Sequence, residues 1–84
     1  MRYIWDVNKD LELRKKGRCS FEKVLVALSD PENIIDDAEN PKYPGQRMYL
    51  VLIDNYPHVV PYEIKGGDIR LITVYPSRKI KRFI

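Results

Sequence analysis

The sequence predicts an α+β fold in which two N-terminal helices pack on a mostly antiparallel sheet of four to five strands. Hydrophobic residues at helical spacing are confined to the first third of the chain. β-Branched and aromatic runs separated by turn residues fill the second half. The chain has 84 residues, which is the size of one domain, so we expect residues 1–84 to form a single domain with a thin core.

Capping residues and hydrophobic spacing mark the two helices. Asp6 is placed to cap a weakly amphipathic helix over residues 7–16, which Gly17 ends. Ser20 is the next expected N-cap, and four hydrophobic residues follow it at close to i, i+3, i+4 and i+7 spacing: Phe21, Val24, Leu25 and Leu28. This second helix ends before Pro31, because the residue that precedes a proline is pushed out of the helical region.

The rest of the pattern is typical of strands. Five segments are expected to be strands, the second of them short at best: residues 2–5, 34–37, 48–53, 58–64 and 69–75. Pro61 lies inside the fourth and predicts an edge strand or a bulge, because proline cannot donate to the hydrogen-bond ladder. After Pro76, Ser77 is placed to cap a short C-terminal helical turn.

Charge and cysteine content narrow the class of protein. The net charge is +3, and residues 46–84 carry the excess, with seven basic and three acidic side chains. Such a surplus suits a surface that binds anions. Cys19 is the only cysteine, which excludes an internal disulfide and favours a reducing cytosol. We see neither a signal peptide nor a membrane span, so we expect a cytoplasmic protein with no membrane partner.

The last sixteen residues, IRLITVYPSRKIKRFI, carry the clearest functional signal. A β-branched strand ends at a proline, and four basic residues follow with no acidic one among them: Arg78, Lys79, Lys81 and Arg82. Guanidinium groups can clamp phosphate oxygens in pairs and ammonium groups add a point charge, so the segment is a candidate phosphodiester site. The alternative is a solvated tail that keeps a small protein soluble.

Several other chemistries lack support in the sequence. No Cys/His spacing suits a metal, and Gly66-Gly67 lies between strands instead of before a helix, where a phosphate-binding loop would stand. One histidine, His58, gives no basis for a Ser-His-Asp arrangement. We therefore expect neither a metal nor a cofactor.

Motifs along nearly the whole chain resemble the BrnT family of toxins. The resemblance rests on Tyr3-Ile4-Trp5-Asp6, Lys9, Lys16-Gly17 and Ser20-Phe21-Glu22, and later on Arg47 and Ile69-Arg70-Leu71-Ile72-Thr73. It implies a RelE-like fold and metal-free RNA cleavage by the toxin of a type II toxin–antitoxin module. It also implies a DNA-binding antitoxin that silences the toxin and represses the operon with it. The chain departs from the family at Lys16, where the family has histidine, and at Tyr75, where it has arginine.

Metal-free RNA cleavage needs a base, an acid and positive charge on the phosphorane oxygens. The candidate catalytic residues are Arg47, Thr73, Tyr75, Arg78 and Lys79. The candidate RNA-binding residues are Arg14, Lys15, Lys16, Lys81 and Arg82. Each has a plainer alternative as a strand-start charge, a strand-packing residue or a solvated helix end. His58 is expected to be a partly exposed strand residue, and a role for it or for Glu63 stays open.

Two functions compete on this sequence. The first is an endoribonuclease toxin that cleaves mRNA, with a cognate antitoxin and RNA as partners and with DNA reached only through the antitoxin. The second is a non-catalytic RNA- or antitoxin-binding module derived from such a toxin. A homodimer and a heterotetramer with the antitoxin both stay open. A DNA-binding protein ranks last, because no helix-turn-helix pattern is evident and the helix over residues 21–28 is apolar.

Overall fold

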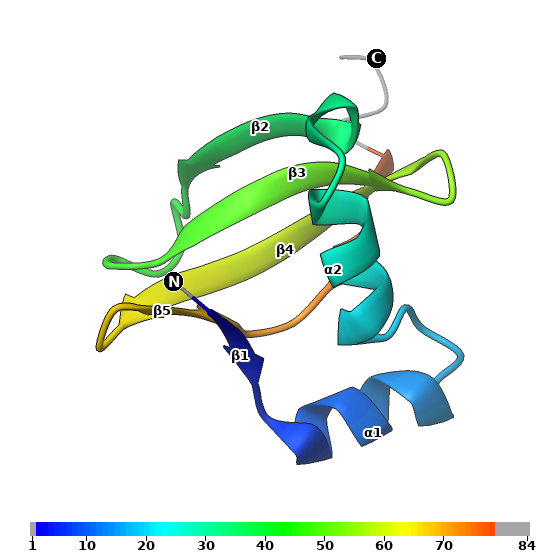
Figure 1. Ribbon diagram of the computed structural model, residues 1–84, viewed down its shortest axis with the longest axis horizontal. Coiled ribbons are helices and arrows are strands. Elements are labelled where there is room, and N and C mark those ends of the chain that lie inside the picture. Colours follow the sequence, from blue (N-terminus) through cyan, green and yellow to red (C-terminus); the bar gives the residue numbers. More distant parts are fainter. Residues whose placement is uncertain (1, 79–84) are drawn as a thin grey trace.

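The computed structural model describes residues 2–78, which form an α+β fold of two N-terminal helices and one six-stranded sheet (Figure 1). In chain order the elements are β1 (Tyr3–Trp5), α1 (Val7–Lys15), α2 (Phe21–Leu28), a 3-10 turn (Pro31–Asn33), β2 (Ile34–Glu39), β3 (Arg47–Ile53), β4 (Tyr56–Lys65), β5 (Asp68–Leu71) and β6 (Tyr75–Pro76). Neither helix in residues 2–78 is long and apolar enough to cross a membrane.

The sheet is mixed and its strand order does not follow the sequence. The order is β1-β5-β4-β3-β2, and β6 pairs with β4 beyond the end of β5. β1 runs parallel to β5, with Tyr3 opposite Ile69 and Trp5 opposite Leu71. The other pairs are antiparallel.

The prediction of a RelE-like, mostly antiparallel sheet of four to five strands is wrong in its number of strands and in missing the parallel β1–β5 pair. The described residues form a larger, mixed sheet of six strands, and strands dominate the fold. The strand expected over residues 69–75 is divided in two: β5 ends at Leu71, and Tyr75 and Pro76 pair with β4 as β6, after which the Ser77 backbone N–H donates to the Pro57 carbonyl oxygen at 3.0 Å. Of the helical turn expected after Pro76, only Ser77 and Arg78 lie within the described residues, and Arg78 is in a 3-10 conformation.

The two helices form where their caps predicted them. The Asp6 side chain accepts a hydrogen bond from the Asn8 backbone N–H at 2.8 Å, and Gly17 adopts φ +70°, which ends the helix at low steric cost. The Ser20 side chain caps α2 by accepting from the Lys23 N–H. A buried carboxylate, Asp10, also accepts from the first N–H of α2, so α1 and α2 are fixed to one another.

Pro61 does not place its strand at an edge, contrary to the prediction. β4 lies between β3 on one side and β5 and β6 on the other. The Pro61 carbonyl accepts from the Ile72 N–H at 2.9 Å, so the main-chain polar groups of Pro61 face the gap between β5 and β6. Proline has no N–H to donate, and at Pro61 that donor would face the gap between β5 and β6, where no strand is paired with β4. An interior strand can therefore hold a proline at this position.

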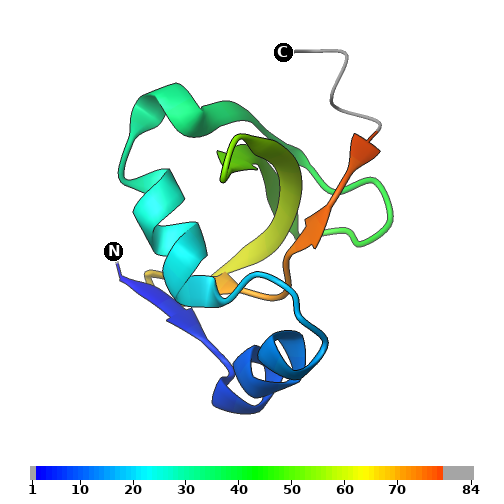
Figure 2. The ribbon, with the colours of Figure 1, turned by 90° about the vertical axis from the view of Figure 1, so that its right-hand side faces the viewer.

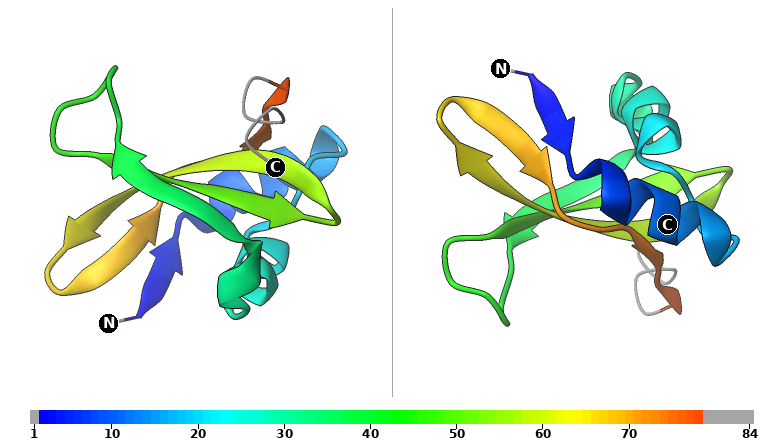
Figure 3. Two further views of the ribbon diagram at one scale, coloured as in Figure 1. Left: turned by 90° about the horizontal axis from the view of Figure 1, so that it is seen from above. Right: turned by 90° about the horizontal axis from the view of Figure 1, so that it is seen from below.

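Helix α2 covers one face of the sheet and makes the core there. Phe21 and Val24 of α2 are fully buried with Val51 of β3 and Val60 of β4. The loop over residues 40–46 and strand β6 lie on the other side of the sheet from α2 (Figures 2 and 3). The sheet therefore carries its core on one face and an open, loop-bordered surface on the other.

Candidate functional site

The open face of the sheet holds a groove between the 40–46 loop and β6, which we call the Tyr75 groove. It consists of two adjoining hollows of about 530 and 590 Å³. Asn40, Lys42 and Tyr75 line both hollows. Tyr43 and Thr73 line only the first, and the second is also lined by Met48, Leu50, Val59, Pro76, Ser77 and Arg78.

Hydrogen bonds within the 40–46 loop fix the wall that carries Lys42 and Tyr43. The Asn40 side chain accepts from the Lys42 N–H at 3.0 Å, and the Asn40 N–H donates to the Gln46 carbonyl at 3.0 Å. The Gln46 N–H in turn donates to the Tyr43 carbonyl at 3.1 Å, and Gly45 adopts φ +86° in this turn. The loop is thus closed by its own bonds and presents the two side chains outward.

Strand β6 supplies the opposite wall. Val74 is fully buried in the core and anchors the segment, while Tyr75 lies opposite Val59 and is 39% exposed. Successive strand residues point to opposite faces, so the burial of Val74 directs Tyr75 to the open face. Thr73, Tyr75 and Arg78, which the sequence proposed as functional, therefore meet around one groove.

The electrostatics of the groove are one-sided. Lys42 and Arg78 are cationic, and no aspartate or glutamate is among the described residues that line either hollow. Within residues 2–78 neither cation takes part in an ion pair, whereas Arg2, Lys23 and Arg70 do. Positive charge without compensating carboxylates attracts anions.

Arg47 does not share this groove. It lies opposite Tyr62 on β4, whereas Tyr75 lies opposite Val59, and positions 59 and 62 of one strand point to opposite faces. The Arg47 Nε donates to Asp37 Oδ1 at 3.2 Å and its Nη2 donates to the Asp37 carbonyl at 2.9 Å. The pKa of Arg47 is raised above its usual value, mostly by its hydrogen bond to Tyr62 and to a smaller extent by its hydrogen bond to Asp37.

Tyr62 completes the cluster around Arg47. Its hydroxyl donates to Asp37 Oδ1 at 2.7 Å, and its ring stacks on Tyr49 with centroids 4.3 Å apart. Burial, followed by the bond to Asp37, raises the pKa of the Tyr62 phenol. These contacts give Arg47 a structural role in holding β2 against β3 and β4.

The candidate residues at the end of α1 also lie apart from the groove. Arg14 pairs with Asp10 at 3.1 Å and with Glu22 at 3.9 Å. Lys16 pairs with Glu12 at 3.0 Å, and Lys15 is exposed. None of these three cations lines the Tyr75 groove. The remaining candidates, Lys79, Lys81 and Arg82, lie outside the described residues.

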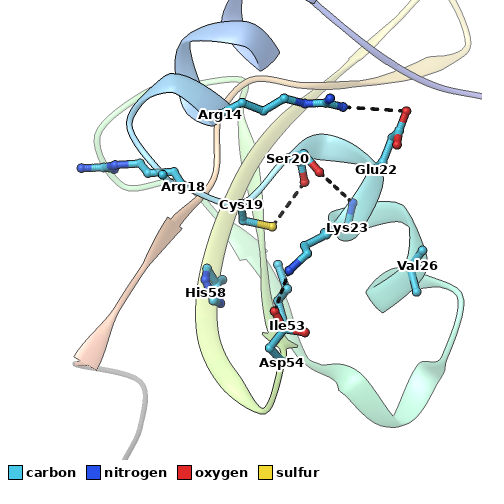
Figure 4. A pocket seen from close by; sticks show the side chains of 11 residues that line it. Arg14, Arg18, Cys19, Ser20, Glu22, Lys23, Val26, Ile53, Asp54 and His58 are labelled. Carbon is cyan, nitrogen blue, oxygen red and sulfur yellow. Dashed lines mark hydrogen bonds and ion pairs between the residues drawn. The ribbon is translucent and has the colours of Figure 1, made fainter.

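A pocket of about 740 Å³, larger than either hollow of the Tyr75 groove, lies on the helix side of the sheet between the α1–α2 connection and the β3–β4 turn (Figure 4). Its Arg14 and Lys23 are neutralised by Glu22 and Asp54, the latter pair at 3.0 Å. The bond to Asp54 raises the pKa of Lys23. The Arg18 side chain extends away from these pairs (Figure 4). The pocket mixes both signs of charge and is less suited to an anion than the Tyr75 groove.

Two potentially reactive side chains line this larger pocket. The His58 Nδ1–H donates to the Tyr56 carbonyl at 2.7 Å, because a carbonyl can only accept, so Nε2 is the ring nitrogen that this bond leaves open. The Cys19 thiol donates to the Ser20 carbonyl at 3.2 Å, and burial raises its pKa. A protonated thiol is a poor nucleophile, so Cys19 is a packing residue at neutral pH.

Sequence reasoning missed Lys42 and Tyr43 as site residues. The signal was present, because a cation and an aromatic residue stand between two prolines in the turn-forming segment NPKYPG. Nothing local, however, places that loop beside β6.

In residues 2–78 no three His, Cys, Asp or Glu side chains cluster in a way that could hold a metal ion. No protein-family model, curated protein or solved structure matches the chain. Function is therefore inferred from the chemistry of the groove and from the motifs of the sequence.

Proposed function

We propose that the protein is the toxin of a type II toxin–antitoxin module and cleaves mRNA in the cytoplasm as a metal-independent endoribonuclease. The observation that carries the proposal is the Tyr75 groove, where Lys42, Arg78 and phenol groups meet with no carboxylate among the described lining residues. Such a lining favours a polyanion with aromatic groups, which is what RNA is. The BrnT-like order of motifs supports the same class of protein.

The groove residues can be assigned to the steps of RNA cleavage. The 2′-hydroxyl gives its proton to solvent water as its oxygen attacks the neighbouring phosphorus, the P–O5′ bond breaks, and the products carry a 2′,3′-cyclic phosphate and a 5′-hydroxyl. Arg78 and Lys42 stabilise the charge that develops on the phosphorane oxygens. The Tyr75 hydroxyl donates to the leaving 5′-oxygen, and the Thr73 hydroxyl positions the phosphate.

Cleavage of a defined RNA in excess EDTA tests this function. The purified protein should turn over many substrates and leave 5′-hydroxyl ends. Arg78→Ala should lower kcat about 100- to 1,000-fold, the usual cost of removing one preorganised charge-stabilising group. Lys65→Ala is the control, because Lys65 is an exposed lysine at the end of β4 that does not line the groove. Intact RNA after incubation with folded protein would refute the enzyme assignment.

The same assignment predicts a phenotype and a partner. Expression from a tightly controlled promoter should arrest growth, and Arg78→Ala should relieve the arrest. A short open reading frame that encodes a DNA-binding antitoxin should adjoin the gene. Normal growth with soluble protein present, together with the lack of such a neighbour, would remove the toxin assignment.

A non-catalytic RNA- or antitoxin-binding module is the second candidate, and two observations favour it. Arg47 is held by Asp37 on the other face of the sheet. The described groove residues also include neither an imidazole nor a carboxylate to act as the base. This candidate predicts salt-sensitive RNA binding without cleavage products. Multiple-turnover cleavage would eliminate it.

A further inference from the structure

We infer that the Tyr75 groove binds single-stranded RNA by stacking unpaired bases on Tyr43 and Tyr75, while Lys42 and Arg78 contact the flanking phosphates. The inference rests on the proposed function in taking RNA as the ligand. It adds the strandedness of that RNA, the residues that receive its bases and a low dependence on base sequence.

Solvent exposure distinguishes Tyr43 and Tyr75 from the tyrosines that pack in the core. Tyr49 and Tyr62 are 8% and 3% exposed and stack on each other in the core. Tyr43 and Tyr75 are 58% and 39% exposed, and both line the smaller hollow of the groove. They come from different segments, the 40–46 loop and β6, and neither ring pairs with another aromatic ring within residues 2–78. Two open phenol rings thus flank a hollow on the surface.

Aromatic and cationic groups are both distributed along the length of the groove. Tyr43 lines only the smaller hollow and Arg78 only the larger one, while Lys42 and Tyr75 line both. A ring therefore lies toward one end, a guanidinium toward the other, and a ring and an ammonium group lie between them. Proteins that hold single strands use this combination, in which rings take the bases and cations follow the backbone.

Unpaired bases are required because stacking needs an open base face. In a duplex both faces of an internal base are covered by its neighbours, so Tyr43 and Tyr75 could reach only phosphates and sugars. The apolar side chains of Met48, Leu50 and Val59 line the larger hollow and offer bases a surface that phosphates do not favour.

The side-chain amides of Asn40 and Gln46 bond to one another within the loop, which argues against base-edge recognition as the main source of affinity. Asn40 Nδ2 donates to Gln46 Oε1 at 3.4 Å, and Asn40 Oδ1 accepts from the Lys42 N–H. These amides hold the loop in shape and are poorly placed to read hydrogen-bonding patterns. Stacking tolerates every base, so we expect U-rich and A-rich strands to bind within a few-fold of each other.

The test measures affinity by fluorescence anisotropy for three labelled probes: a U-rich RNA decamer, the same decamer with abasic sites in its centre, and an RNA hairpin of equal charge. Wild-type protein should bind the intact decamer about 5- to 150-fold more tightly than the abasic one, the range of one stacked base. It should also prefer the decamer to the hairpin. This comparison needs no variant and is independent of folding defects.

Variants then assign the effect to the two rings. Tyr43→Ala and Tyr75→Ala should each lose most of the preference for the intact decamer, and Tyr43→Phe and Tyr75→Phe should keep it, because phenylalanine retains the ring. Tyr3→Ala is the matched control, since Tyr3 is a partly exposed tyrosine on β1 outside the groove. Its preference should equal that of the wild type.

The outcomes separate this inference from the proposed function. Equal affinity for intact and abasic decamers would overturn base stacking and leave RNA binding in place. If Tyr43→Ala and Tyr75→Ala both keep the preference for the intact over the abasic decamer, the bases stack elsewhere and the Tyr75 groove is not the stacking site. A protein that binds none of the three RNAs would overturn the proposed function and this inference together.

Discussion

Replacing the two groove cations should flatten the salt dependence of RNA binding. Each phosphate contact on a single strand contributes about 0.7 to the slope of log affinity against log salt. Lys42 and Arg78 are the only cations among the described residues that line the groove. If each holds one phosphate, Lys42→Gln combined with Arg78→Gln should reduce the slope by about 1.4, and each single variant by about 0.7. Over a fourfold rise in salt, the double variant should lose about sevenfold less affinity than the wild type.

Anisotropy titrations of the RNA decamer at four or five salt concentrations measure these slopes. Lys65→Gln is the control for net charge, because it removes one positive charge from an exposed site outside the groove. It should change the slope by well under 0.7, the value expected for one phosphate contact. An unchanged slope in the double variant, or an equal fall in Lys65→Gln, would refute phosphate binding in the groove.

Three further predictions concern the supports of the fold. Asp10→Ala should lower the free energy of unfolding in urea by about 1–2 kcal/mol, because Asp10 of α1 accepts a hydrogen bond from the Phe21 N–H at the start of α2. An unchanged urea midpoint would contradict this. Arg47→Gln should lower the thermal midpoint slightly and leave RNA affinity intact, because Arg47 binds Asp37 on the face of the sheet opposite the groove. A folded variant that loses RNA affinity would show that Arg47 belongs to the RNA site after all. Burial and the bond to Asp37 raise the pKa of Tyr62 in the folded protein. The protonated phenol therefore contributes its full stabilisation below about pH 10, the usual pKa of tyrosine, and this stabilisation is lost as the pH rises further. Tyr62→Phe should therefore lose less stability than the wild type between pH 10 and 11 in urea titrations, and parallel losses would contradict the cause given.

The helices were predictable because their signals are local. Asp6, Gly17 and Ser20 each act through neighbours in sequence, as caps or as a stop. The sheet was predicted less well because its pairing is decided over long distances. Nothing near Tyr3 indicates that β1 will lie parallel to β5, and nothing near Tyr75 indicates that β6 will pair with β4.

Because strand pairing is decided over long distances, the sequence also could not show which candidate site residues would lie together. Alternation along a strand says which residues share a face, but the register between strands decides which faces coincide. Thr73, Tyr75 and Arg78 follow one another closely and stayed together around the groove. Arg47 came from a distant strand and turned to the opposite face.

The central claim is that RNA occupies the open face of the sheet beside β6. Backbone amide chemical-shift mapping with the single-stranded RNA decamer tests it most directly. The account predicts that the largest shifts fall in the 40–46 loop and in residues 73–78, with small shifts around Cys19 and His58. Shifts centred on the pocket that Cys19 and His58 line, with the loop and β6 unmoved, would contradict it.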